Sequence, residues 1–587
     1  MRPRRCSTGG NRDKNNVESC CFLMNTKKLL VEMRKNAPLY FAFLFITIAQ
    51  VAVILYYTCE RRNLYIDEIW TFNTANHYFF PFLFQNNEPY LNTWLPASFW
   101  AKSIVADPAH TFSYGSVFYN MSLDHHPPLY IAVIHTVCSL FPGEFSRWFG
   151  IVPNLLFFIL GQVTFYVINC KLFGKKAVAL GLCLLFGSCW GTVNNVILIR
   201  MYTLLVLFAL LFFYAHLQML INVKKQDYSK KTLLLLYVFS ICGFLTHYYF
   251  LIYASYMFFS TVVLLCFYHK KHVIAPYFFT LLGALLSCIL INPCILDQIF
   301  GITGQLGTES WHNLIHSDFM SRSAIMSGLI SRDLLGHKAR LFILLVTVIF
   351  VIKAVLKILE KHEQEPADTA AAAGEVNRAF SLPVTVKSIQ PGIFLAAVSS
   401  SAYFITVAKI VPYYQNRYMY IIYPLIIICL FSILYGLLQS LTLKRGLSLA
   451  LTVLIIMGLN TSYYSPRNLD LLDDSYPKML AAVKSEYSNV NMITVSNTSC
   501  WWPVVSNILV YREVPYTLMI DESRLPEIDR ITNALPFNPD AFLIYRGICC
   551  KTKPKDFITM VKMTTGFTNH KQFGRQQFGE IYLFSRK

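Results

Sequence analysis

The chain has few charged residues for its length, and its cysteines show no spacing of the kind that holds zinc. Of its 587 residues, 14% are charged, whereas 55% are hydrophobic and 15% are aromatic. This balance excludes a soluble protein of several domains, because the apolar residues fall in runs of membrane-spanning length. The sixteen cysteines are scattered, many of them within those runs, where a thiol behaves as a small hydrophobic group.

The apolar runs predict an α-helical polytopic membrane protein with about eleven transmembrane helices. A span needs about 20 mostly apolar residues, and a helix satisfies its backbone groups within its own segment. The expected spans are 38–57, 148–169, 177–193, 196–220, 232–249, 250–268, 273–292, 339–358, 392–411, 418–437 and 447–465.

The net charge of +19 comes from basic residues that lie beside the spans, so it indicates membrane orientation and no nucleic-acid partner. The first span is long and lacks a small-residue cleavage pattern, which predicts an anchor and no cleaved signal. With the N-terminus in the cytoplasm, five basic connections fall on that side: Lys171–Lys176, Lys224–Lys231, Lys270–Lys271, Lys353–Lys361 and Lys444–Arg445.

The apolar stretch Pro128–Phe141 has about fourteen residues, too few to cross roughly 30 Å of hydrocarbon. Counting it as a span would also move every basic connection outside. We therefore expect a juxtamembrane helix on the outer surface, starting at Pro127–Pro128. The alternative is a short tilted span.

The C-terminal part of the chain is predicted to form an extramembrane α/β domain, because β-type runs at 492–495, 514–520, 541–545 and 580–584 alternate with helical stretches at 478–487 and 555–565. With this domain, the chain divides into five expected segments. The segments are a basic cytoplasmic tail (1–37), a transmembrane module with outer loops 58–147 and 293–338 (38–358), an Ala-rich cytoplasmic linker (359–391), C-terminal transmembrane helices (392–465) and the outer domain (466–587).

Four cysteines lie on the predicted outer side, where a disulfide can form among them, and the sequence leaves the pairing open. They are Cys59, Cys500, Cys549 and Cys550.

Polar residues gather at the outer ends of the predicted spans, and there are no internal repeats or Gly/Pro-broken helices of the kind that transporters use. The polar residues of this outer group are Asp67, Glu68, Asn194, Asn195, Arg200, Thr246, His247, Tyr248, Gln415, Asn416 and Arg417.

Arg200 stands between apolar residues on both sides, where an unpaired guanidinium costs a few kcal/mol. One interpretation is that Arg200 extends to the lipid headgroups. The other is an anion site, because the planar fork of arginine suits phosphate.

Asp67 and Glu68 lie in an aromatic setting, Tyr65 to Trp70, just after the first span. A solvated pair that caps a helix is one interpretation. The other is a general base held against the membrane, where desolvation would raise the pKa of a carboxyl.

The candidate histidines on the predicted outer side can also be interpreted as structural residues. His247 fits a core histidine between aromatic residues, and His125 and His126 fit a helix start or a substrate contact. No cofactor is assigned. A divalent metal with Glu68 or His247 has little support, because a ligand geometry cannot be read from the sequence.

Five motifs in this order resemble the GT-C superfamily of membrane glycosyltransferases, in the branch that holds family 39, the protein O-mannosyltransferases and the bacterial aminoarabinose transferases. The resemblance covers about residues 38–270. The motifs are Asp67-Glu68, His126-Pro127-Pro128, Leu172-Phe173-Gly174 with Lys175 and Lys176, Arg200-Met201-Tyr202 and Thr246-His247-Tyr248.

The resemblance implies inverting transfer of a sugar from a polyprenyl or dolichyl phosphate donor to an acceptor on the outer or lumenal face. It implies that Asp67 deprotonates the acceptor, that Glu68 orients acceptor or donor, and that Arg200 binds the lipid phosphate. Further expected contacts are Arg417 and Tyr202 for the donor phosphate or lipid, and His125, His126, His247 and Asn195 for acceptor or donor sugar.

The sequence departs from these relatives at two points. The C-terminal segment lacks a β-trefoil, which argues against a protein Ser/Thr acceptor. No acidic residue stands just before Arg200, which weakens a metal site.

The sequence thus predicts a lipid-phosphate-dependent glycosyltransferase in the plasma membrane of a prokaryote or the endoplasmic reticulum of a eukaryote. Its acceptor, a glycan, lipid or protein, stays open. The alternative is a polytopic transporter or lipid flippase.

Overall fold

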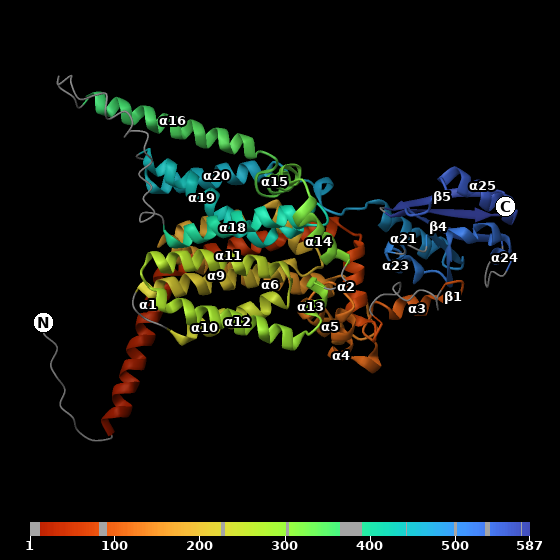
Figure 1. The fold of residues 1–587 in the computed structure, drawn as a ribbon, viewed down its shortest axis with the longest axis horizontal. Helices are drawn as coiled ribbons and strands as arrows, with labels where there is room; N and C mark the ends of the chain where they lie inside the picture. The colour runs from red at the N-terminus through yellow and green to blue at the C-terminus, as the bar shows by residue number, and fades with distance from the viewer. Residues whose placement is uncertain are drawn as a thin grey trace.

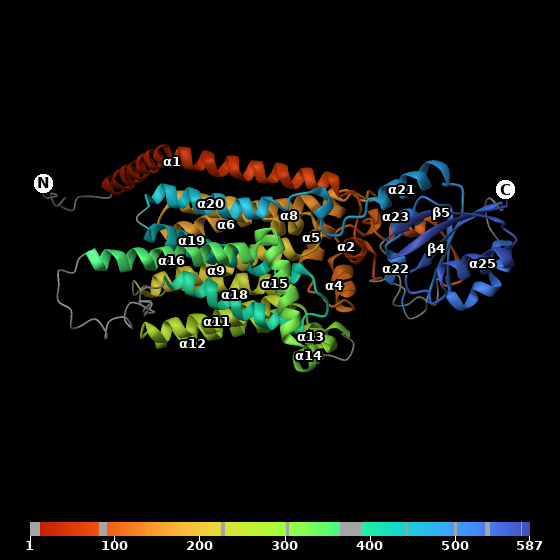
Figure 2. The ribbon, with the colours of Figure 1, turned by 90° about the horizontal axis from the view of Figure 1, so that it is seen from above.

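The computed structural model describes residues 12–80, 91–224, 229–300, 305–363, 390–441, 443–497, 500, 502–533, 540–576 and 578–586. Long helices run side by side in one bundle, and a sheet domain lies beyond one end of that bundle (Figures 1 and 2). This arrangement confirms the predicted fold class, a helical membrane protein with a C-terminal α/β domain.

Eight helical segments among the described residues are long and apolar enough to cross a membrane, or nine if a bent pair counts as one span. The bundle helices are α1 (Arg12–Glu60), α6 (Trp148–Phe173), α7 (Lys176–Gly187), α8 (Trp190–Ile197), α9 (Tyr202–Lys224), α10 (Lys230–Phe244), α11 (Tyr249–Phe267), α12 (Ile274–Ile291), α16 (Ala339–Glu363), α18 (Pro391–Ile410), α19 (Tyr423–Ser440) and α20 (Arg445–Thr461).

The predicted number of eleven spans was therefore too high by the length rule. The expected spans 232–249 and 447–465 correspond to α10, with 15 residues, and α20, with 17 residues. At 1.5 Å per residue these helices are about 22 and 26 Å long, short of roughly 30 Å of hydrocarbon. Both pack against other helices of the bundle, α10 against α9 and α12, and α20 against α19 and α7.

Both predicted cytoplasmic segments overlap helices. Helix α1 begins at Arg12, within the expected tail 1–37, and α16 ends at Glu363, within the expected linker. The rest of that linker up to residue 389, and residues 1–11, lie outside the described residues.

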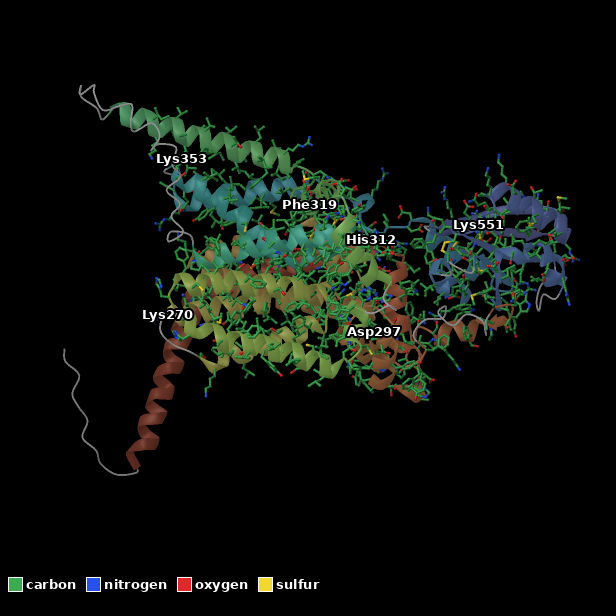
Figure 3. All side chains as sticks on the ribbon, in the orientation of Figure 1. Lys270, Asp297, His312, Phe319, Lys353 and Lys551 are labelled. Carbon is green, nitrogen blue, oxygen red and sulfur yellow. A yellow bond between two sulfur atoms is a disulfide. The ribbon has the colours of Figure 1, made fainter. Side chains whose placement is uncertain are left out.

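The two ends of the bundle differ in the way the charge pattern predicts. Lys270 and Lys353 lie at the end far from the sheet domain, whereas Asp297 and His312 lie at the end next to it (Figure 3). The sheet domain and the polar groups thus share one end, which we call the outer end.

One span is broken, contrary to the expectation from the sequence. Helices α7 and α8 meet at a 60° bend. Side chains contact the last turn before the bend: Gln50 Nε2 donates to Cys183 O at 3.0 Å and to Leu184 O at 3.2 Å, and Gln162 Nε2 donates to Gln50 Oε1 at 3.2 Å. Ser188 N keeps its helical bond to Leu184 O at 3.1 Å, so side chains from two neighbouring helices add to the helical bonds beside the bend.

Shorter helices cover the outer end. The stretch predicted to lie on the surface forms α5, an 11-residue helix packed against α2, α4 and α6. The outer helices are α2 (Ile66–Asn76), α3 (Ala97–Lys102), η1 (Pro108–His110), α4 (Tyr114–Ser122), α5 (Leu129–Ser139), α13 (Ile295–Phe300), α14 (Gln305–His316), α15 (Phe319–Leu335), η3 (Asn416–Tyr418), η4 (Tyr420–Ile422) and η5 (Pro466–Asn468), while η2 (Lys271–Val273) lies at the other end.

The sheet has six strands in the order β1-β3-β2-β4-β6-β5, with β3, β2 and β4 parallel and the rest antiparallel. The strands are β1 (Trp94–Pro96), β2 (Met492–Ser496), β3 (Tyr516–Asp521), β4 (Ala541–Gly547), β5 (Asn569–Gln576) and β6 (Gly579–Ser585). The helices of this domain are α21 (Ser475–Glu486), α22 (Trp502–Val505), α23 (Ile508–Tyr511), η6 (Glu522–Glu527), α24 (Ile528–Asn533) and α25 (Pro554–Thr565).

The four predicted strands are present, and two others escaped prediction. β5 is mostly exposed and polar, so it lacks apolar alternation. β1 has three residues and belongs to the first outer loop, where it pairs with β3 through Trp94 and Leu518. The outer domain therefore includes a piece of the N-terminal half.

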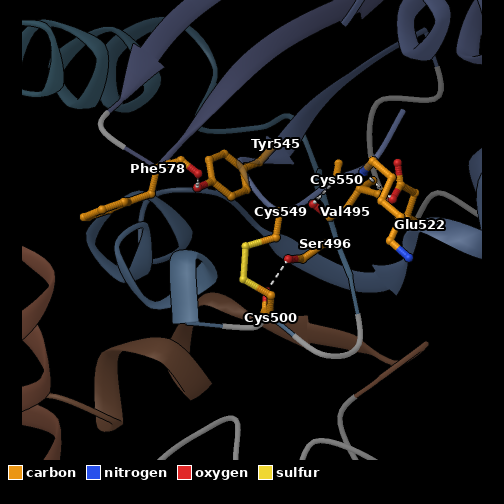
Figure 4. Close-up of a disulfide and its surroundings, with 9 residues drawn as sticks. Val495, Ser496, Cys500, Glu522, Tyr545, Cys549, Cys550 and Phe578 are labelled. Atoms are coloured by element: carbon orange, nitrogen blue, oxygen red, sulfur yellow. Dashed lines mark hydrogen bonds between the residues drawn. A yellow bond between two sulfur atoms is a disulfide. The ribbon is translucent and has the colours of Figure 1, made fainter. Parts of the chain in front are cut away.

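A disulfide joins Cys500, after β2, to Cys549, after β4 (Figure 4). Ser496 Oγ donates to Cys500 O at 2.7 Å beside it. Cys59 and Cys550 are free. The bridge ties together the carboxyl ends of two neighbouring parallel strands.

We predict that Gly187→Ala destabilises the bundle, because a Cβ there would overlap the side chains of Gln50 and Gln162. Overpacking of this kind costs about 1–3 kcal/mol. The thermal unfolding midpoint in detergent should fall. Gly436→Ala, where nothing lies within 4 Å, is the matched control. Equal midpoints for both variants would contradict the packing at the bend.

Candidate functional site

Glu68 fixes the start of α2 from inside the protein. Its carboxylate forms an ion pair with Arg61 and accepts a hydrogen bond from Tyr65 N at 2.7 Å, the geometry of a capping box. Its other oxygen accepts from Ile199 N at 2.8 Å. Glu68 is fully buried, so it holds α2 against the residues before Arg200.

Asp67, the neighbouring residue, points to a different partner. It forms an ion pair with Arg417, and the two side chains are 14% and 11% exposed. Burial raises the pKa of Asp67, but the Arg417 and Arg200 guanidinium groups outweigh burial, so the net pKa lies below its ordinary value. The sequence predicted a raised pKa, because it did not reveal these two cations.

Arg200 lies beside the same turn of α2. Its Nη1 donates to Asp67 O at 3.3 Å and to Thr71 Oγ1 at 3.2 Å, and its Nη2 approaches His126 Nε2 at 3.4 Å. Its Nε is buried and, among the described residues, has no hydrogen-bond partner. One donor of a buried guanidinium is therefore left for a ligand.

His126 is a neutral acceptor in this arrangement. Arginine can only donate, so His126 Nε2 must accept from Arg200, and Nδ1 then carries the hydrogen that points to Asp124 Oδ1 at 3.4 Å. Burial lowers the pKa of His126, which favours the same neutral form.

Asp124 anchors the His-Pro-Pro loop. Its Oδ1 accepts from His125 N at 2.6 Å, and its carbonyl accepts from Gln298 Nε2 at 2.6 Å. Gln298 in turn accepts from Tyr248 OH. The loop is therefore clamped to α13 and to the connection between α10 and α11.

His247 and Tyr202 complete the cluster. Their rings lie 5.6 Å apart, and the His247 ring lies 5.8 Å from that of His126. His247 Nδ1 accepts from Tyr249 N at 3.0 Å, so Nε2 carries the hydrogen, and that buried nitrogen has no partner among the described residues. Arg417 stacks on Tyr202 at 5.9 Å.

A cavity of about 370 Å³ opens beside these histidines. His125, His126 and His247 line it together with aromatic and aliphatic side chains of α11, α13, α14 and α18. Leu251 and Thr406, which also line it, lie inside two candidate spans. The cavity therefore extends from the polar cluster to the level of the membrane helices.

A second, smaller pocket of about 160 Å³ lies on the Arg417 side of the cluster. Arg61, Arg332, Asn416, Arg417 and Asp470 are among its lining residues. Two kinds of space thus adjoin the cluster: a largely apolar cavity beside its histidines and a more polar pocket beside Arg417.

The structure brings together most residues that the sequence singled out. Asp67, Arg200, Arg417 and Tyr202 form one cluster, and the lining histidines His125, His126 and His247 adjoin it. Asn195 does not join them, because its carbonyl and side-chain oxygens accept from Thr203 and it lines a separate void of about 10 Å³.

Sequence reasoning missed Arg61, Asp124 and Gln298 as parts of this site. Asp124 stood next to the histidines that were chosen, and its carboxylate was the available signal. Arg61 resembles any basic residue after a span, and nothing in the sequence links Gln298 to the His-Pro-Pro loop.

No group of three or more His, Cys, Asp or Glu side chains is placed to hold a metal ion within the part of the chain that the structure describes. Glu68 is occupied by Arg61, and His247 faces the cavity without an acidic neighbour in contact.

These features define an integral, multi-pass membrane protein with a carboxylate–arginine cluster at the outer end of its helices. No protein-family model and no curated protein matches the chain. Among solved structures, the chain is similar to ArnT from Cupriavidus metallidurans bound to undecaprenyl phosphate, with 9% identity, a TM-score of 0.47 and coverage of 92% of this chain and 97% of ArnT. The chain is also similar to the apo state of ArnT from Cupriavidus metallidurans, with 10% identity, a TM-score of 0.43 and coverage of 91% of this chain and 97% of ArnT.

We predict that Glu68→Gln destabilises the protein, because it leaves Arg61 as a buried charge without its partner. Such a loss costs about 3–5 kcal/mol. The midpoint of thermal unfolding in detergent measures it. Glu527→Gln breaks the exposed pair with Arg524 and should change stability by less than about 0.5 kcal/mol. Similar losses in both variants would contradict the role of Glu68.

We also predict a pH-dependent contribution from Asp124. Burial raises the pKa of Asp124, but His126, Arg200 and the backbone N–H of His125 together lower it more, and the net pKa is about 2. A carboxyl with a lowered folded-state pKa stabilises above its unfolded value, about 3.9, and this stabilisation is lost as the pH falls towards about 2. The gap in unfolding midpoint between wild type and Asp124→Asn should be constant from pH 7 to 5 and then shrink. A gap that changes between pH 5 and 7 would refute the assignment.

Proposed function

We propose that the protein is a GT-C-type membrane glycosyltransferase. It transfers a sugar from a polyprenyl or dolichyl phosphate donor to an acceptor hydroxyl on the outer or lumenal face, with inversion. One observation carries the proposal. The Asp67 carboxylate pairs with Arg417, and Arg200 donates to the Asp67 backbone carbonyl and approaches His126, which lines a cavity that extends to the membrane helices.

The proposed reaction takes place at the anomeric carbon of the donor sugar, and it needs a base for the acceptor hydroxyl and a cation for the leaving phosphate. Asp67 takes the proton of the acceptor hydroxyl while the hydroxyl oxygen forms a bond to the anomeric carbon. The bond between that carbon and the phosphate oxygen breaks, and its electron pair leaves with the lipid phosphate. Arg200 stabilises the charge that grows on the phosphate. Attack opposite the leaving group accounts for inversion.

Free donors support a phosphate at this position. Arg200 Nε and His247 Nε2 are buried and lack partners among the described residues. Both nitrogens can donate, and a phosphate oxygen can accept from them. Arg417 is the second cation of this proposal, and its ion pair with Asp67 supports a phosphate and a base that act close to each other.

The lowered pKa of Asp67 makes it an ionised carboxylate at neutral pH. Such a carboxylate can accept a proton, but it is a weak base, so we propose that transfer of the proton accompanies bond formation instead of preceding it. Glu68, with both oxygens occupied by internal donors, acts in this proposal by positioning α2.

The larger cavity suits the donor. Its walls are mostly aromatic and aliphatic, and the span residues Leu251, Ile252 and Thr406 are among them. A polyprenyl chain can therefore reach the cavity from the bilayer while its phosphate meets the polar cluster. In this proposal the first module, 38–358, supplies Asp67 and Arg200, and the second, 392–465, supplies Arg417.

The bend between α7 and α8 favours the alternative, a transporter or lipid flippase, because broken helices hold cargo in such proteins. Here, however, Gln50 and Gln162 donate to carbonyls of the last turn of α7, just before the bend. The polar cluster also lies at one end of the bundle. Both features support the enzyme over the transporter.

We predict that Asp67→Asn abolishes sugar transfer. Purified protein is incubated with radiolabelled polyprenyl and dolichyl phosphate sugars, and release of label from the lipid is measured. The variant should lose at least about 100-fold in rate, because the base is removed. Glu527→Gln, far from the cluster, serves as the control. A wild-type protein that releases no label from any donor, or a variant as active as the wild type, would refute the proposal.

We further predict that Arg200→Ala chiefly weakens use of the donor. Loss of a charged hydrogen bond to the phosphate should raise the donor KM about 10-fold or more. Arg524→Ala, an exposed arginine of the outer domain, is the control. An unchanged donor KM with normal turnover would show that Arg200 does not hold the phosphate.

A further inference from the structure

The small polar pocket has its own composition and has no role in the donor site described above. Its walls come from α15, from the segment around η3, and from Asp470 and Leu471, which lead into the outer domain. Arg417 lines this pocket, whereas the next residue, Tyr418, lines the larger cavity. The two spaces therefore meet at η3, and Arg417 of the ion pair borders the smaller one.

The arginines of the pocket are already neutralised. Arg61 pairs with Glu68, Arg417 pairs with Asp67, and Arg332 binds both Asp333 and Asp470 at 2.8 and 2.9 Å. An anion entering the pocket would find no unbalanced positive charge. The one carboxylate in excess belongs to the pair Asp333 and Asp470, which already accepts hydrogen bonds from Asn416 and Tyr423. The electrostatics favour a neutral ligand.

The pocket nevertheless offers polar contacts. Arg61 Nε and Arg417 Nε are buried and have no hydrogen-bond partner among the described residues, so both can donate to a ligand. The Asp470 side chain is 22% exposed and can accept. A neutral ligand that both accepts and donates hydrogen bonds fits this combination, as hydroxyl groups do.

Aromatic side chains stand beside these polar groups. Tyr414 and Tyr420 line the pocket together with the aliphatic Leu329 and Leu471. Apolar walls with a few directed polar groups are the usual composition of a site for a small molecule. The volume of about 160 Å³ is below the range usual for drug-sized ligands, so it suits a single ring.

We propose that this pocket is the acceptor site and that it binds a neutral, hydroxyl-rich group, the chemistry of a terminal sugar or polyol. The inference rests on the proposed function for its chemistry. A hydroxyl bound against Arg417 lies one side chain from Asp67, which takes its proton as the new bond to the donor sugar forms. Donor and acceptor thus approach the ion pair through different spaces.

Photo-crosslinking tests the pocket without requiring turnover. The probes are glucosides, galactosides and mannosides with a diazirine on the sugar, each as an octyl glycoside and as a free sugar. At least one probe should label the peptides around 414–420 or 469–473. If only octyl glycosides label, the acceptor is carried on a lipid, and if free sugars also label, a soluble glycan suffices.

A pocket-filling variant provides the control on position. Leu329→Trp fills the pocket without removing an ion pair, and labelling should fall about 10-fold. Leu341→Trp, on the exposed face of α16, should leave labelling unchanged. The proposal is overturned if no probe labels these peptides, if labelling persists in Leu329→Trp, or if undecaprenyl phosphate displaces the probe.

Asp470→Asn separates this inference from the proposed function. With a labelled donor and the best glycoside, the acceptor KM should rise about 10-fold, as expected for one weakened hydrogen bond, while the donor KM stays within about twofold. Release of donor label without labelling of the pocket refutes the acceptor site alone. Labelling of the pocket by a protein that never releases donor label refutes the glycosyltransferase alone.

Discussion

The ion pair between Asp67 and Arg417 is the interaction around which the outer end of the bundle is built. Its partners are 350 residues apart in sequence and come from opposite halves of the chain. A pair that is partly withdrawn from water loses hydration, and it is tolerated when other groups satisfy its remaining donors and acceptors. Here Arg200, the aromatic faces of Tyr202 and Tyr418, and the cap of α2 surround it.

Each cation around that pair has its own support. Glu68 pairs with Arg61. Asp333 pairs with Arg332 and accepts a hydrogen bond from Asn416, the residue before Arg417. Burial raises the pKa of Asp333, which Arg332 opposes, and the net pKa is about 6. The cluster is thus close to electrical balance before any ligand arrives. A single phosphate or hydroxyl can then enter without leaving a large unpaired charge behind.

The outer domain is joined to the bundle at more than its chain connection. β1, from the first outer loop, extends the sheet of the C-terminal half, and Asp470, just before the domain, bonds Arg332 and Asn416. The polar pocket lies where these segments meet. Any movement of the domain relative to the bundle would therefore act on the surroundings of Arg417.

The sequence by itself determined the membrane class, the end of the bundle that carries the polar residues, four strands of the outer domain and most members of the cluster. These follow from local signals: apolar runs, basic flanks and charged residues at the ends of spans. Only the tertiary structure decided which groups pair, because Asp67 and Arg417, or Glu68 and Arg61, carry no mark of their partners. The direction of the Asp67 pKa shift, the internal position of Asn195, the bend after Gly187 and the strand β1 depend on contacts between distant segments, and a single sequence read locally contains no distances.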